Sequence, residues 1–142
     1  MDIAVITVGY NRPDSMQQLL NTVVNADYEN DKVDLIISID KGERQSEIIK
    51  VAENIKWSYG EKKIRAFSER QGLRNHIIQC GDMTEYYDAV VVLEDDLMVS
   101  KYYYTYVKQA LAFYCDDCKI AGISLYKHQT HPGVYRPFEP VN

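Results

Sequence analysis

The chain has 142 residues, a formal net charge of −5 and 46% hydrophobic residues. This length fits one domain with its own core, and the hydrophobic content excludes a disordered chain. The acidic balance argues against a nucleic-acid-binding surface or an electrostatic membrane anchor, and no stretch approaches the roughly 20 apolar residues that a membrane span needs.

Strand and helix patterns alternate from the amino end. Residues 3–8 form a continuous apolar strand. Apolar residues at helical spacing follow, and Pro13 stands at the first helical turn, where its missing N–H costs nothing. Residues 33–39 predict a second strand that ends at Asp40, and residues 48–55 carry the apolar stripe of a second helix.

The middle of the chain continues this alternation. A short third strand at about residues 63–67 leads into a loop and then into a weaker helix that carries Leu73 and Ile77. Residues 89–93 are a fourth strand. The chain begins directly in a strand pattern, without a basic leader or cleavage site, so we expect a cytoplasmic protein.

Residues 103–114 place apolar side chains on one face of a further helix, and residues 119–125 predict a fifth strand. The helix face comprises Tyr103, Tyr106, Val107, Ala110 and Tyr114. Alternation of this kind predicts an α/β fold, a Rossmann-like core with a mainly parallel sheet and helices on both faces. We expect one core over residues 1–125 and an irregular tail over residues 126–142.

Three consecutive acids, Glu94, Asp95 and Asp96, follow the fourth apolar run. Such a run is typical of a central parallel strand, and in open α/β sheets ligands bind beyond the carboxyl ends of the strands. Adjacent carboxylates repel one another unless a cation or hydrogen-bond donors compensate them. Mg²⁺ or Mn²⁺ suits carboxylate oxygens, and an acidic loop that is merely solvated is the alternative.

The first and second strands also end in polar residues, which parallel strands place on the same rim as the acids. A helix that begins near Pro13 would offer its N–H groups to an anion, and Arg12 adds donors suited to phosphate. Asp40 could accept from a base N–H or a ribose hydroxyl. The alternatives are a surface charge for Arg12 and a turn former for Asp40. Together these groups favour a nucleoside diphosphate with a metal ion.

The cysteines and histidines, which could bind a metal or form disulfides, show weaker patterns. The three cysteines make no disulfide framework, and the Cys115–x–x–Cys118 spacing has no second pair for structural zinc. This pair also follows a predicted helix, whereas a thioredoxin-like pair precedes one, so we interpret it as incidental. His128 and His131 lie in a segment rich in turn formers, and we interpret them as solvated.

Residues 5–13, 37–42, 71–75, 92–100 and 102–104 form an ordered set of motifs across nearly the whole chain. At these motifs the chain resembles the amino-terminal half of a GT-A glycosyltransferase, most closely the N-acetylglucosaminyltransferase I-like group and its bacterial relatives. The resemblance implies a nucleotide-sugar donor, expected to be UDP-linked, and a glycan or other hydroxyl acceptor.

The resemblance also implies roles for residues of the rim. Asp96 would ligate Mn²⁺ or Mg²⁺, Asp40 would read the uracil or ribose, and Arg74 would lie near the diphosphate or sugar. The implied nucleotide-sugar contacts are Gly9, Tyr10, Asn11, Arg12, Asp40, Arg74, Glu94 and Asp95.

The chain departs from the family in its later part. Inverting members supply the catalytic base from a region beyond the acidic motif, whereas here Glu139 is the one carboxylate after Asp117. No catalytic residue is therefore assigned, and we expect donor binding without efficient transfer, whether the chain is a truncated piece or a natural short form.

Two other functions remain open. A noncatalytic nucleotide-binding or interaction module would keep the rim residues and lack the base. A phosphoacceptor receiver domain has a similar fold, but its acid pair belongs after the first strand, where this chain has Tyr10, Asn11 and Arg12.

Overall fold

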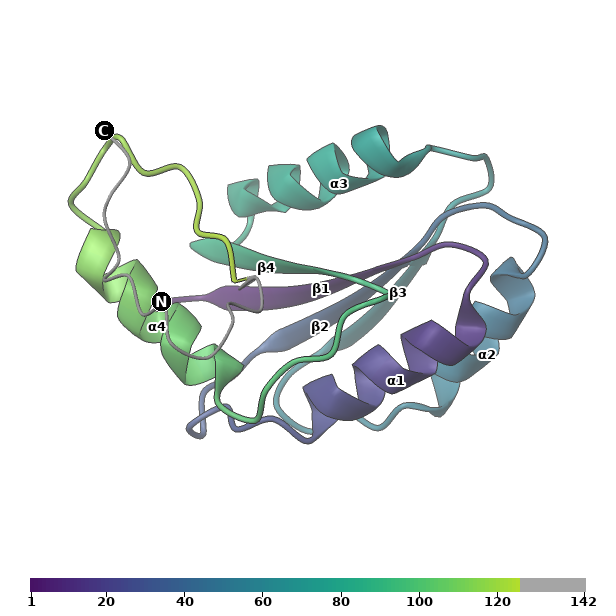
Figure 1. Cartoon of the computed structure of the whole chain (residues 1–142), viewed down its shortest axis with the longest axis horizontal. Coiled ribbons are helices and arrows are strands. Elements are labelled where there is room, and N and C mark those ends of the chain that lie inside the picture. The colour runs from purple at the N-terminus through teal and green to yellow at the C-terminus, as the bar shows by residue number, and fades with distance from the viewer. Residues whose placement is uncertain (126–142) are drawn as a thin grey trace, which may run out of the picture.

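The computed structural model describes residues 1–125, which are built on one parallel four-stranded sheet in the order β3-β2-β1-β4 (Figure 1). β1 (Ile3–Gly9) and β2 (Asp34–Ile39) are central, while β3 (Lys62–Ala66) and β4 (Ala89–Glu94) form the two edges. All three strand pairs are parallel. The carboxyl ends of the four strands therefore meet at one rim, as the sequence predicts.

Helices cover both faces of this sheet (Figure 1). α1 (Pro13–Val24) and α2 (Gln45–Asn54) lie on one face, and α3 (Leu73–Gly81) lies on the other. A short 3-10 helix, η1 (Asp82–Glu85), follows α3, and α4 (Tyr103–Tyr114) follows β4. The predicted α/β, Rossmann-like architecture is confirmed.

The central strand shows why the sequence folds in this way. Every residue of β1 is buried, because successive side chains enter different cores. Ile3 and Val5 pack in the larger core with α1 and α2, whereas Ala4, Ile6 and Val8 pack in a smaller core below α3. A continuous apolar run is what a strand covered on both faces requires.

The first helix begins as the sequence predicts. Pro13 occupies the first turn of α1, and Met16, Leu19, Leu20 and Val23 are fully buried on one face. This stripe holds α1 against the sheet, so the loop between β1 and α1 is fixed at the rim.

The prediction of a fifth strand is wrong. Residues 119–125 form no strand, and Ile120 and Leu125 keep 43% and 39% of their surface exposed. β4 is consequently an edge strand within the described residues, with Val90 and Val92 only half-buried. A short apolar run has the same hydrophobic pattern whether or not its backbone hydrogen-bonds to a neighbouring strand, so the pattern alone does not show that a strand forms.

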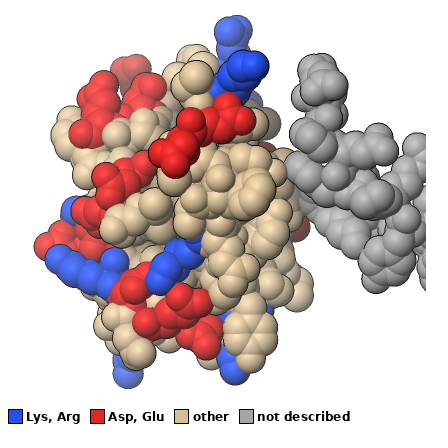
Figure 2. All heavy atoms as spheres, turned by 90° about the vertical axis from the view of Figure 1, so that its left-hand side faces the viewer, with Lys and Arg blue, Asp and Glu red and all other residues tan. Residues whose placement is uncertain are grey.

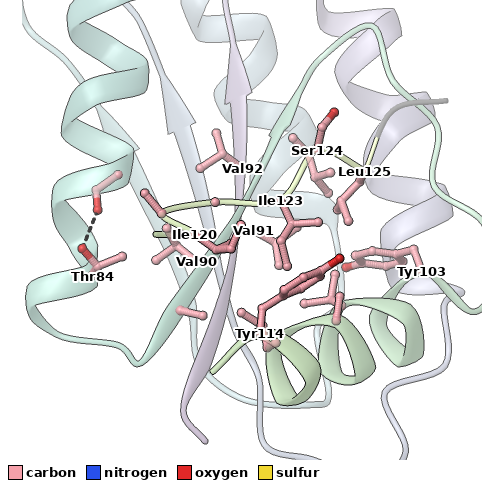
Figure 3. A pocket seen from close by; sticks show the side chains of 18 of the residues that line it. Thr84, Val90, Val91, Val92, Tyr103, Tyr114, Ile120, Ile123, Ser124 and Leu125 are labelled. Atoms are coloured by element: carbon pink, nitrogen blue, oxygen red, sulfur yellow. Dashed lines mark hydrogen bonds between the residues drawn. The ribbon is translucent and has the colours of Figure 1, made fainter. Parts of the chain in front are cut away.

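A wide apolar groove of about 1250 Å³ separates β4 from residues 117–125 and α4 (Figure 3). Tyr103 and Tyr104 of α4 are buried, and the Tyr28 and Tyr103 hydroxyls lie 2.7 Å apart. Tyr106 is 55% exposed, so its predicted place on the buried face is wrong. Uncharged surface lies beside acidic groups on the side of the molecule that bears α4 (Figure 2).

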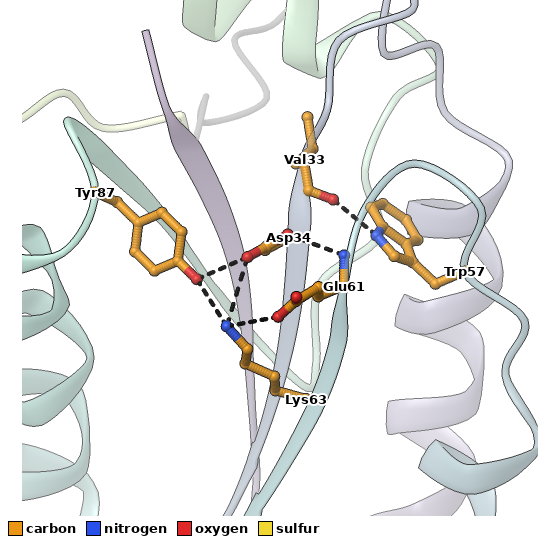
Figure 4. A network of polar contacts seen from close by, with 6 residues as sticks. All are labelled: Val33, Asp34, Trp57, Glu61, Lys63 and Tyr87. Carbon is orange, nitrogen blue, oxygen red and sulfur yellow. Dashed lines mark hydrogen bonds and ion pairs between the residues drawn. The ribbon is translucent and has the colours of Figure 1, made fainter.

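A polar network lies at the amino ends of β2 and β3, at the end of the sheet opposite the rim (Figure 4). Asp34 accepts a hydrogen bond from the Tyr87 hydroxyl at 2.9 Å, and Lys63 pairs with Glu61 at 3.1 Å. The Trp57 indole donates to the Val33 carbonyl oxygen. These contacts fix the starts of β2 and β3.

No helix within residues 1–125 has the length and apolar character to cross a membrane.

Candidate functional site

A pocket of about 180 Å³ lies at the carboxyl ends of β1, β2 and β4. It is on the predicted rim, at the point where the chain order of the sheet reverses between β1 and β4. Its lining comes from the three strand ends, the loop before α3 and α3 itself: Val8, Gly9, Tyr10, Arg12, Asp40, Arg70, Gly72, Leu73, His76, Glu94 and Asp95.

An ion pair joins the ends of β1 and β4. Arg12 Nη2 lies 2.6 Å from Asp95 Oδ1, and the Tyr10 backbone N–H donates to Asp95 Oδ2 at 3.1 Å. Asp95 is buried, and this burial raises the pKa of its carboxyl, although the Tyr10 N–H and the Arg12 guanidinium oppose the rise. Asp95 therefore orients the Arg12 guanidinium at the pocket.

The other two acids of the triad are exposed. Asp96 Oδ2 lies 3.7 Å from Arg12 Nη1, and the Asp96 side chain is 56% exposed. Glu94 lines the pocket and is exposed. Within residues 1–125, no three His, Cys, Asp or Glu side chains converge in a way that could hold a metal ion. Any metal here would need ligands beyond the described residues.

Asp40 is buried at the end of β2 and accepts three backbone hydrogen bonds. Its Oδ1 accepts from the N–H groups of Lys41 at 2.8 Å and Gln71 at 2.7 Å, and its Oδ2 accepts from Gly72 N–H at 3.0 Å. Asp40 thus ties the loop before α3 to the end of β2. A carboxylate oxygen has two lone pairs, so Oδ2 retains one acceptor site.

The loop before α3 forms another wall of the pocket. Gly72 has φ 74° and ψ 155°, a conformation that is essentially restricted to glycine. Arg70 lies over the Tyr10 ring, with its guanidinium carbon 5.0 Å from the ring centre. The pocket lining therefore includes two arginines, Arg12 and Arg70.

Asn11 and Gly9 shape the loop that follows β1. Asn11 has φ 53°, and its side-chain oxygen accepts from the Arg44 N–H at 3.0 Å. A Cβ at Gly9 would stand 2.3 Å from the Met16 terminal methyl carbon. Both residues therefore have structural roles at the rim, and the Asn11 side-chain oxygen is already engaged with the protein.

Three of the predicted site residues, Asn11, Arg74 and Asp96, are not among the residues that line the pocket. Arg74 is exposed on α3. Cys80 is buried, whereas Cys115 and Cys118 are exposed, and none of the three forms a disulfide within the described residues. His128, His131 and the predicted irregular tail lie outside those residues.

Sequence reasoning missed Arg70 and His76 as pocket residues. Arg70 follows β3, so the argument that placed the other strand ends at the rim would also have found it. His76 is fully buried and hydrogen-bonds Ser38 in β2. That contact depends on how α3 packs on the sheet, and the helical stripe of Leu73 and Ile77 gave no signal for it.

Comparisons with known proteins support the fold. No family model matches the chain, and neither does any curated protein. Among solved structures, S. aureus TarS is 18% identical with a TM-score of 0.56, over 82% of this chain and 20% of TarS. TarS 1-349 in complex with UDP-GlcNAc is 17% identical with a TM-score of 0.55, over 82% and 32% of the two chains.

A mannosyltransferase structure shows the same likeness. The mannosyltransferase PcManGT from Pyrobaculum calidifontis, in complex with GDP-Man and Mn²⁺, is 17% identical with a TM-score of 0.58, over 81% of this chain and 32% of that one. The chain thus spans a third or less of these structures. It shares the fold of these structures, while the closer likeness to the N-acetylglucosaminyltransferase I-like group stays a prediction.

Proposed function

We propose that this chain forms the nucleotide-sugar-binding part of a glycosyltransferase and that its donor is a UDP-sugar. The observation that carries the proposal is the pocket itself, where the ends of β1, β2 and β4 bring Arg12, Asp40 and the acidic triad together. TarS structures contain UDP and UDP-GlcNAc, and that of PcManGT contains GDP-Man and Mn²⁺, which supports this class of donor.

The arginines of the pocket lining would contact the diphosphate. Arg12 and Arg70 both line the pocket, and guanidinium groups suit phosphate oxygens through paired N–H donors. α1 begins at Pro13, directly after Arg12, and has no side-chain cap. Its unpaired N–H groups and positive helix end add to the attraction for an anion. The nucleobase would then lie toward Asp40 and the loop before α3.

The acids fit a metal that is shared with the ligand. Mg²⁺ and Mn²⁺ are often held by one or two carboxylates and complete their coordination with phosphate oxygens and water. Asp96 is exposed and only distantly paired with Arg12, so its carboxylate is the candidate ligand. Asp95 is instead engaged by Arg12 and Tyr10. When bound, such an ion would neutralise negative charge on the diphosphate.

The residues of the pocket would bind and orient the donor, and a hydroxyl acceptor such as a glycan would attack the sugar. We assign no catalytic base. Asp40 and Asp95 are the buried carboxylates of the rim, and both already accept hydrogen bonds from the protein. This engagement favours, as a second candidate, a noncatalytic nucleotide-binding module. Transfer or hydrolysis of a UDP-sugar by the chain would exclude that candidate.

Chemical-shift mapping tests the proposed site. Titration of the ¹⁵N-labelled chain with UDP and Mg²⁺ is expected to shift the backbone amides of Tyr10, Gln71 and Gly72, because these line or border the pocket. The Trp57 indole signal, from the opposite end of the sheet, is the internal control. Shifts confined to residues away from the rim would contradict the proposal.

A further inference from the structure

The outer edge of β4 has no neighbouring strand within residues 1–125, because the sheet ends there. The Ala89 N–H donates toward β1, to the Asp2 carbonyl oxygen, at 3.3 Å. Successive residues of a strand direct their backbone groups to opposite sides, so those of Val90 and Val92 point away from β1. Neither amide donates a hydrogen bond in the described part of the chain. Such a row of N–H and C=O groups is a template for pairing with another strand.

The apolar groove of about 1250 Å³ runs beside this edge (Figure 3). All six residues of β4 line it, and α4 contributes Tyr103, Val107 and Leu111. On the other wall, Ile120 and Leu125 keep much of their surface exposed. Apolar surface in water is unfavourable, so an occupant that covers these walls would bind with a gain in free energy.

The wall across the groove from β4 also has backbone donors. Residues 119–125 have the apolar character of a strand but form none, and they line the groove from residue 120 onward. Among them, the N–H groups of Ala121, Gly122 and Ile123 donate to no acceptor in the described part of the chain. An extended segment between the two walls would therefore find backbone partners on β4 and across the groove.

The charged side chains that line the groove are all acidic. They are Asp88 before the start of β4, Glu94 at its end and Asp117 on the other wall, and all three are exposed. No Lys or Arg among residues 1–125 lines the groove. Asp88 and Glu94 are six residues apart, a distance of about 20 Å along a strand. A second copy of this chain would bring the same acids against these, so charge favours a partner with basic ends.

The backbone edge decides which class of occupant fits. A lipid chain or a small apolar molecule would cover the walls but leave the N–H and C=O groups of Val90 and Val92 without partners in an apolar setting, which is unfavourable. A polypeptide strand covers the walls with alternate side chains and pairs with the same backbone groups.

We propose that the groove beside β4 docks an extended segment of another protein, which adds to β4 as a strand and carries alternating apolar residues between Lys or Arg at its ends. Backbone hydrogen bonds to Val90 and Val92 supply affinity, and the acids select the basic ends. This site goes beyond the proposed nucleotide pocket and does not depend on nucleotide binding, although Glu94 lines both.

Hydrogen exchange of the ¹⁵N-labelled chain tests the proposal with the synthetic peptide Lys-Val-Thr-Val-Thr-Val-Lys. Its two lysines match the spacing of Asp88 and Glu94. At a peptide concentration of about 100 times the dissociation constant, exchange of the Val90 and Val92 amides should slow about 100-fold. The Glu43 amide, in the exposed loop before α2, donates to no described acceptor and should keep its exchange rate.

Substitutions separate backbone pairing from apolar contact. V92P removes the outward N–H, which an edge strand tolerates, and should weaken peptide binding roughly 2- to 12-fold, the worth of one neutral hydrogen bond. V92T keeps the N–H and the branched side chain and should stay within about 2-fold of wild type. D88N and D117N together should reduce the preference for the Lys-ended peptide over one with Glu at both ends.

Three results would overturn the proposal, and the wild-type measurements decide it even if V92P does not fold. The first is unchanged exchange of Val90 and Val92 with the Lys-ended peptide, and the second is equal wild-type affinity for the Lys-ended and Glu-ended peptides. The third is slow exchange of both amides before any peptide is added. Sedimentation would then attribute that protection to a second copy in a dimer or to the chain itself in a monomer.

Discussion

Arg12 and Asp95 form an ion pair across the boundary between β1 and β4, with 2.6 Å between Arg12 Nη2 and Asp95 Oδ1. Asp95 is 3% exposed, whereas the Arg12 side chain is 53% exposed. A buried acid therefore holds a solvent-facing guanidinium in place before any ligand binds. Such preorganisation reduces the entropy cost of ligand binding. We therefore expect Asp95 to support the proposed anion site by holding Arg12 in place.

Loss of this pair should destabilise the fold. Arg12→Ala leaves the buried Asp95 carboxylate with the Tyr10 N–H as its remaining partner, and we expect a loss of about 1–3 kcal/mol in the free energy of unfolding. Arg44→Ala is the matched control, because its pair with Glu47 is exposed on both sides and should contribute little to the free energy of unfolding. Urea denaturation at neutral pH measures both. Equal losses of unfolding free energy in the two variants would contradict the difference between the partly buried pair and the exposed pair.

The two glycines that flank α3 should respond in opposite directions to alanine. Gly72 has φ 74° with open space around its Cβ position, so Gly72→Ala adds backbone strain alone, of about 1–3 kcal/mol. Gly81 has helical angles and the same open space, so Gly81→Ala should stabilise by about 0.4–1 kcal/mol. Thermal unfolding of both variants tests this. The account of the loop fails if Gly72→Ala is neutral.

His76 should make stability depend on pH. Burial lowers the pKa of its imidazole below the ordinary 6.5, so the unfolded chain binds more protons than the folded chain below that pH. The free energy of unfolding should therefore fall as the pH drops from about 7.5 to about 5.5. His76→Gln removes this contribution while Asp95, whose raised pKa acts in the opposite direction, stays unchanged. Parallel pH profiles for the two chains would contradict the assignment.

Asp96 should carry the effect of metal. Because its carboxylate is exposed, Asp96→Ala should leave the melting temperature unchanged and abolish the gain in UDP affinity that Mn²⁺ provides. Glu85→Ala removes an equivalent charge on η1, away from the pocket, and should retain that gain. If Asp96→Ala still gains UDP affinity with Mn²⁺, then another residue is the metal ligand.

The sequence predicted the parts of this structure that depend on local pattern. The strand ends, Pro13 at the start of α1 and the common rim follow from apolar periodicity and from the geometry of parallel strands. The fold class follows from their alternation. These features require no knowledge of which side chains meet.

Other features depend on contacts between distant segments. The loop before α3 brings two N–H donors to Asp40, from Gln71 and Gly72, which no pattern near Asp40 reveals, and the reading of a nucleotide by Asp40 stays a prediction. Arg74 was predicted from motif position alone, and Arg70, which lines the pocket, was not considered. The fifth strand was predicted wrongly for the same reason. Whether residues 119–125 pair with a neighbouring strand depends on where that distant backbone lies, and the apolar pattern of the segment does not show this.

Calorimetric titration of UDP into the chain with Mn²⁺ tests the central claim most directly, when wild type is compared with Arg12→Ala and with Lys50→Ala, an exposed charge on α2. We predict saturable binding to wild type and to Lys50→Ala, and a roughly 10- to 150-fold loss for Arg12→Ala, the worth of a charge-assisted hydrogen bond. Absence of binding to the wild-type chain, or equal affinity in all three, would contradict a nucleotide site at the carboxyl ends of β1, β2 and β4.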